Sequence, residues 1–108
     1  MADYDVEWQA ALHLLRSPLL ARKSTDQYLN PARRDIDWDR LLADAGAWSS
    51  GERLFAEVAY ALWRGHGSDT IRAIGLLDEG NWQRFLQALQ LRRGERPDLA
   101  THPEGWGS

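Results

Sequence analysis

The segment Ser49–Gly65, SSGERLFAEVAYALWRG, carries the clearest helical pattern in the chain. Ser49 is a favourable N-cap, and Glu52 follows three residues later, where its side chain can bond back to the N-cap backbone. Apolar residues then recur at intervals of three and four, namely Leu54, Phe55, Val58, Ala61 and Leu62. Gly65 is a typical helix stop. The pattern predicts an amphipathic helix that presents one apolar stripe to a core.

The flanking sequence repeats this helical spacing and shows no sustained alternation with period two. Further helices are predicted at about residues 4–16, from Asp35 or Asp37 to Gly46, at 70–77, and from Asp78 to Arg92-Arg93-Gly94. We therefore expect an all-α, small single-domain bundle of four to five short helices. Residues 1–94 are expected to form this compact domain, and residues 95–108, with two prolines and two glycines, an irregular C-terminal tail.

The stretch from Ser17 to Asp35 has no clear period. Pro18 ends the first helix, because proline lacks a backbone donor and disfavours helical geometry in the residue before it. Asn30-Pro31 is typical of a turn. The stretch is predicted to hold one or two short helices or to form a surface loop.

A chain of 108 residues with 44% hydrophobic and 27% charged residues has an ordinary globular composition and fits one domain. The absence of cysteine excludes disulfides, thiolate metal sites and a cysteine nucleophile. The acidic N-terminal residues do not match a secretory signal, and no uncharged apolar run approaches the roughly 20 residues of a membrane span. We expect a cytoplasmic protein without membrane association. Lys23 is the only lysine against twelve arginines, which favours a GC-rich bacterial or phage source.

Acidic residues alternate in the segment Asp35-Ile36-Asp37-Trp38-Asp39. The same alternation is found at the start of a calcium-binding EF-hand loop. The rest of such a loop is missing, because Arg40 and Gly46 stand where the turn glycine and the bidentate glutamate belong. We interpret these acids as residues of a helix start, where the positive end of the helix dipole favours negative side chains. Histidine spacing and serine context match no catalytic or metal motif, so no catalytic, metal or cofactor residue is predicted.

Six tryptophans are an unusual number for a chain of this length, and they suggest an interaction surface. Trp8, Trp63 and Trp82 follow helical apolar stripes and are assigned to the core. The predicted protein-interaction residues are Tyr28, Trp38, Trp48, Arg22, Lys23, Arg33 and Arg34. The leading hypothesis is a small non-enzymatic interaction protein, an accessory or regulatory subunit or a phage-type inhibitor, with a protein partner of unknown identity.

The alternative hypothesis is a nucleic-acid-binding regulator that uses a helix-turn-helix-like pair at residues 70–92. Its groove-facing side chains are predicted to be Gln83, Arg84, Gln87 and Gln90. The formal net charge of -3 and the acids at Asp78 and Glu79 argue against this hypothesis. An enzyme of unrecognised type is the third hypothesis, and self-association as a homo-oligomer is compatible with all three.

Overall fold

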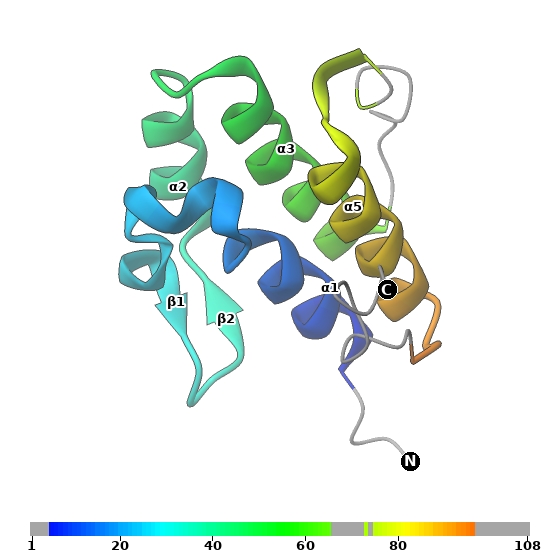
Figure 1. Cartoon of the computed structure of the whole chain (residues 1–108). Coiled ribbons are helices and arrows are strands. Elements are labelled where there is room, and N and C mark those ends of the chain that lie inside the picture. The colour runs from blue at the N-terminus through cyan, green and yellow to red at the C-terminus, as the bar shows by residue number, and fades with distance from the viewer. Residues whose placement is uncertain (1–4, 66–72, 74, 97–108) are drawn as a thin grey trace.

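The structure is a computed structural model, and it describes residues 5–65, 73 and 75–96. Most of these residues lie in helices. The predicted all-α class is confirmed, with the addition of one two-stranded antiparallel sheet (Figure 1). The elements are α1 (Val6–Leu15), the 3₁₀ helices η1 (Pro18–Lys23) and η2 (Thr25–Tyr28), strands β1 (Leu29–Asn30) and β2 (Asp35–Ile36), and helices α2 (Trp38–Ala45), α3 (Ser50–Arg64) and α5 (Glu79–Arg92).

The core forms around α1, which packs against both α3 and α5 (Figure 1). The largest fully buried apolar side chains are Phe55, Phe85, Leu14, Leu15, Leu20, Leu41 and Leu54. Trp8 is 6% exposed and belongs to this core, as predicted. Trp63 and Trp82 are partly buried and pack against it.

Side-chain caps begin the α-helices where the sequence predicts them. Ser49 and Glu52 form the predicted capping box at the start of α3, with both reciprocal bonds present. Asp37 accepts from the backbone N–H of Arg40, and Asp78 caps α5 in the same way. Gly65 ends α3 with a φ of 84°, a left-handed conformation that favours glycine.

Two arginines of α5 bond to the last turns of other helices. Arg84 Nε donates to the backbone oxygen of His13 in α1 at 2.8 Å, and Arg92 Nε donates to that of Leu62 in α3 at 2.6 Å. These carbonyls lie near helix C-termini, where backbone oxygens lack partners within the helix. Side chains of α5 therefore supply hydrogen-bond donors to backbone oxygens in the last turns of both α1 and α3.

The stretch without sequence periodicity contains η1, η2 and the β1–β2 hairpin. Its first part is tied to α1, because Thr25 Oγ1 donates to the backbone oxygen of Leu15 at 2.6 Å. The strands pair Leu29 with Ile36 and Asn30 with Asp35. No strand was expected, and two-residue strands are too short to show the alternation by which strands are recognised.

The hairpin also corrects the predicted start of the second α-helix. Asp35 lies in β2 and does not support a helix dipole, whereas Asp37 and Asp39 occupy the N-cap and first turn of α2. Of the helix expected at 70–77, the described residues Ala73, Gly75 and Leu76 are helical, and residues 70–72 and 74 lie outside the described residues. Most of the expected tail, residues 97–108, also lies outside them.

Candidate functional site

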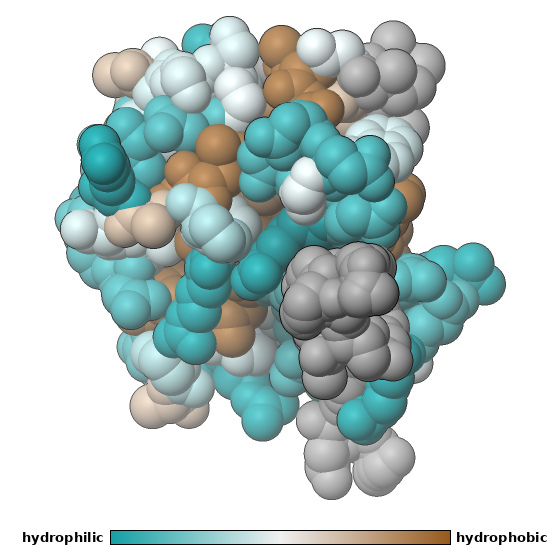
Figure 2. Space-filling view, in the orientation of Figure 1, coloured by the Kyte–Doolittle hydropathy of each residue, from teal (hydrophilic) through white to brown (hydrophobic). Residues whose placement is uncertain are grey.

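Figure 2 shows one face of the molecule, on which hydrophobic residues appear as separate areas between hydrophilic side chains. A cleft of about 780 Å³ lies beside the β1–β2 hairpin. One wall is the hairpin with the end of η2, a second is the start of α2, and the third is the C-terminal part of α3. Segments from both halves of the chain thus meet at this cleft.

Four aromatic residues line the cleft, and three of them, from α2 and α3, form a group of neighbouring rings. Trp38, the first residue of α2, lies 5.0 Å from Tyr60 and 5.7 Å from Trp63 between ring centroids, with interplanar angles of 43° and 57°. Tyr60 and Trp63 are three residues apart on α3, so both point toward α2. The Trp38 indole nitrogen is buried, and no described residue accepts its hydrogen bond. The rings form a tilted row with Trp38 in the middle.

One guanidinium already lies against this row. The Cζ atom of Arg64 stands 4.2 Å from the centre of the Tyr60 ring, within the range of a cation–π contact. Arg64 is exposed, and it also lines the cleft.

Carboxylates are also part of the lining. Asp35, Asp37 and Asp39 all border the cleft at exposed positions. Asp35 accepts from the backbone N–H of Ile36 at 2.9 Å, so its side chain also fixes the strand end. Among the described residues, no group of three or more metal-ligating side chains is arranged to hold a metal ion.

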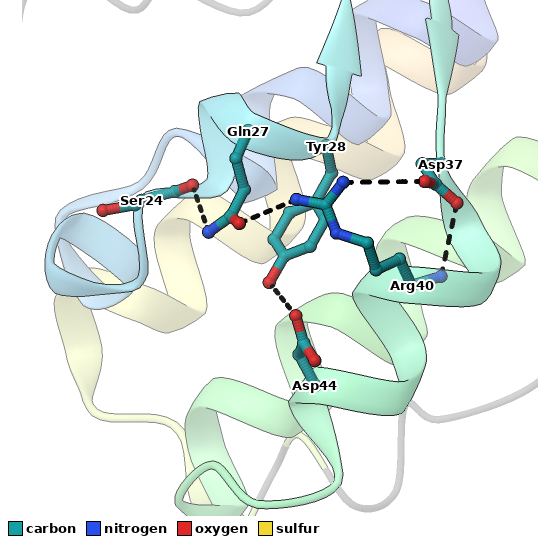
Figure 3. A network of polar contacts seen from close by, with 6 residues as sticks. All are labelled: Ser24, Gln27, Tyr28, Asp37, Arg40 and Asp44. Carbon is teal, nitrogen blue, oxygen red and sulfur yellow. Dashed lines mark hydrogen bonds and ion pairs between the residues drawn. The ribbon is translucent and has the colours of Figure 1, made fainter.

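Gln27 and Asp37, which line the cleft at the end of η2 and the start of α2, belong to a polar network (Figure 3). Arg40 lies over the ring of Tyr28, with Cζ 4.9 Å from its centre. Its guanidinium donates to Gln27 Oε1 at 2.7 Å and pairs with Asp37 at 3.8 Å (Figure 3). The network joins η2 to α2 and fixes the two walls relative to each other.

Tyr28 is buried within this wall, at 4% exposure, and its hydroxyl donates to Asp44 Oδ2 at 2.6 Å (Figure 3). Burial and the hydrogen bond to Asp44 raise the pKa of Tyr28 to about 12. A ring that is buried against its own domain has little surface to offer a partner, so Tyr28 acts as support for the cleft.

The predicted interaction residues do not form one surface. Trp38 lies in the cleft, whereas Trp48 is half-buried in the α2–α3 connection, where Lys23 Nζ stands 5.6 Å from its ring. Lys23 also pairs with Glu52 at 3.4 Å. The remaining basic residues are exposed at two different places, Arg22 in η1 and Arg33 and Arg34 in the turn of the hairpin.

The side chains proposed for nucleic-acid contact are partly used inside the fold. Arg84 bonds to the His13 backbone, and Gln87 Oε1 lies 2.8 Å from His13 Nε2. Gln83 donates to Glu79 within α5 at 3.1 Å, and Gln90 is exposed. At least two of the four therefore face α1, which counts against a groove-reading surface on this side of α5.

Sequence reasoning did not assign Tyr60, Trp63 and Arg64 to a functional site. The sequence pattern places Trp63 in the core and gives no reason to single out Tyr60 or Arg64. A usable signal is their spacing, because positions three and four apart share one face of a helix, next to the apolar stripe of α3. Trp38, whose ring contacts this face of α3, lies outside the helical stripes of the sequence and is one of the predicted interaction residues.

Comparison with protein-family models, with curated proteins and with solved structures finds no match to this chain. None of the helices in the described residues has the length and apolar character that crossing a membrane requires.

Proposed function

We propose that the protein is a small non-enzymatic binding protein, of accessory or regulatory type, which recognises a basic segment of a protein partner in the cleft beside the hairpin. The observation that carries this proposal is the meeting of three aromatic rings with three aspartates in one open cleft of about 780 Å³. Trp38 and Tyr28 are common to this site and to the interaction surface expected from the sequence, with Tyr28 buried in the wall of the cleft.

The chemistry of the lining favours a cationic ligand. Aromatic faces carry negative electrostatic potential and attract ammonium and guanidinium groups. Asp35, Asp37 and Asp39 outnumber the one cation of the lining, Arg64. A lysine or arginine side chain can lay its apolar stem on the rings and place its charge near the carboxylates. The same carboxylates would repel the phosphates of a nucleic acid, so the protein-partner hypothesis is the better supported one.

The volume suits a short stretch of chain. Clefts of about 300–1,000 Å³ hold small molecules or a few side chains. The rim charges are exposed, so each is expected to add only about 0.2–1 kcal/mol to binding. Most of the affinity must then come from contact with the rings, and the acids contribute selectivity for basic sequences.

The test is a titration followed by NMR on the nitrogen-labelled full chain, in which every tryptophan gives one indole N–H signal. The probes are the basic peptide acetyl-Gly-Arg-Gly-Lys-Gly-amide and its acidic counterpart with Asp and Glu in place of the cations. The basic peptide should shift the Trp38 and Trp63 signals saturably, and the acidic peptide should not. Equal shifts with both peptides, or none with either, would refute the proposal.

The double variant Asp35→Asn/Asp39→Asn tests the role of the rim. It should weaken binding of the basic peptide by about two- to thirtyfold, from two exposed charges. Asp26→Asn is the matched control, because Asp26 is highly exposed on η2 and does not line the cleft. The control removes one charge and the double variant two, so a loss of binding free energy in the control of half that in the double variant or more would show that net charge, and not the cleft, attracts the peptide.

A further inference from the structure

The guanidinium of Arg64 shows how a cation sits on the aromatic row. It lies 4.2 Å from the Tyr60 ring centre, at the same cleft where the proposed basic ligand would bind. Arg64 follows Tyr60 by four residues on α3, so the contact is between neighbours on one helix face. The position over Tyr60 is therefore filled by the protein's own side chain.

We infer that the cleft selects an arginine side chain of the partner, and that this side chain takes the position over Tyr60 which the guanidinium of Arg64 occupies in the free protein. The inference rests on the proposed function and specifies which cation the cleft prefers. Two observations support it, the chemistry of the lining and the weak hold on Arg64.

The chemistry of the lining favours guanidinium over ammonium. A guanidinium is planar and weakly hydrated, so it stacks on an aromatic ring more readily than the compact, strongly hydrated ammonium of lysine. The cleft offers tilted rings 5.0 and 5.7 Å apart with carboxylates nearby, and a guanidinium can bond to a carboxylate with two parallel donors. The neighbouring wall shows this type of contact again, with Arg40 stacked on Tyr28 while it pairs with Asp37.

Arg64 is held much less firmly than Arg40. Besides its contact with the Tyr28 ring, Arg40 donates a 2.7 Å hydrogen bond to Gln27 and pairs with Asp37. The interaction shown for Arg64 is with the Tyr60 ring. Arg64 is exposed and lies at the last position of α3, next to the left-handed Gly65. Its side chain can turn into solvent without breaking a buried bond, so an incoming arginine can replace it at small cost.

The experiment compares three peptides on the full chain by the same NMR titration. The probes are acetyl-Gly-Arg-Gly-amide, acetyl-Gly-Lys-Gly-amide, and the citrulline peptide, which keeps the planar shape of arginine without its charge. The arginine peptide should bind about two- to fivefold more tightly than the lysine peptide, the range expected for a better exposed cation–π contact. The citrulline peptide should bind more weakly than both.

Variants of Arg64 then test the shared position. Arg64→Gln empties it, and affinity for the arginine peptide should rise about two- to fivefold. Arg64→Lys keeps the charge and weakens the stacking, so affinity should rise by a smaller factor that is still above the parent protein. Arg53→Gln removes the same charge from the same helix about 16 Å away, beyond the screening length at physiological salt, and should leave affinity unchanged.

The outcomes separate this inference from the proposed function. If the parent protein binds arginine and lysine peptides equally, or if both Arg64 variants bind like the parent, the inference is refuted and the basic-peptide function stands. A rise in Arg64→Gln alone would show an effect of charge and would also refute the shared position. If neither the parent nor any variant binds a basic peptide, the proposed function itself fails.

Discussion

Replacing Tyr28 by phenylalanine tests whether the buried wall of the cleft depends on one hydrogen bond. The ring is 4% exposed, and its hydroxyl donates to Asp44 at 2.6 Å. Hydrogen bonds to charged groups contribute about 1.5–3 kcal/mol, but Asp44 is exposed and regains water when the hydroxyl is lost. We therefore expect Tyr28→Phe to lower the free energy of unfolding by about 1–1.5 kcal/mol, which is about 4–12 °C in Tm for a domain of this size.

The pH dependence of this loss provides a sharper test. Tyrosine in an unfolded chain ionises near pH 10, whereas burial and the bond to Asp44 raise the pKa of folded Tyr28 to about 12. The folded state thus holds its proton more tightly, and the stabilisation is fully present below pH 10 and is lost as pH rises through about 12. The difference in stability between the parent and Tyr28→Phe should be constant from pH 7 to 9 and then shrink.

The assay is urea unfolding followed by circular dichroism, for both proteins across this pH range. Tyr60→Phe is the matched control, since it removes a hydroxyl from the half-buried ring in the cleft and should change stability by less than about 0.5 kcal/mol. A Tyr28→Phe variant as stable as the parent at pH 7 would refute the role of the hydrogen bond. A stability difference that stays constant up to pH 12 would refute the assignment of the raised pKa to Tyr28.

Three further predictions concern the helices. Burial lowers the pKa of His13 below 6.5, so stability should fall as pH drops from 7 to 5 because the unfolded state binds the proton first, and His13→Gln should flatten this fall in urea unfolding curves. Ser49→Ala should cost about 1 kcal/mol by thermal unfolding through loss of the α3 cap, whereas Ser50→Ala, one residue inside the helix, should cost little. Gly65→Ala should cost about 1–2 kcal/mol because Gly65 has a φ of 84°, and Gly46→Ala, at a φ of -58°, should be nearly neutral in the same measurement.

The longer α-helices could be predicted because local signals agree with their packing. The capping box at Ser49, the cap at Asp78 and the apolar stripe of α3 each depend on residues a few positions apart. The β1–β2 hairpin could not be predicted in this way. Its two-residue strands carry no period, and their position is fixed by the polar network behind Tyr28 and by packing against the rest of the fold.

The candidate site could be predicted only in part from the sequence, for a related reason. An apolar stripe shows which side of a helix faces the core, but it does not show where the neighbouring element leaves that side uncovered. Trp63 fits the stripe of α3 and packs against the core as predicted, but its ring also contacts Trp38 at the edge of the cleft. Only the placement of α2 and the hairpin against the end of α3 distinguishes the two roles.

The position of α1 between α3 and α5 has a consequence for how the chain is made. Because α1 packs on helices that begin more than forty and more than seventy residues later, its apolar side chains have no complete set of neighbours while synthesis is in progress. At ordinary rates of translation this interval lasts several seconds, far longer than a short helix needs to form. Of these three helices, α1 is thus synthesised first and enclosed last, and the Arg84 side chain can bond to the His13 carbonyl in its last turn only after α5 has been synthesised.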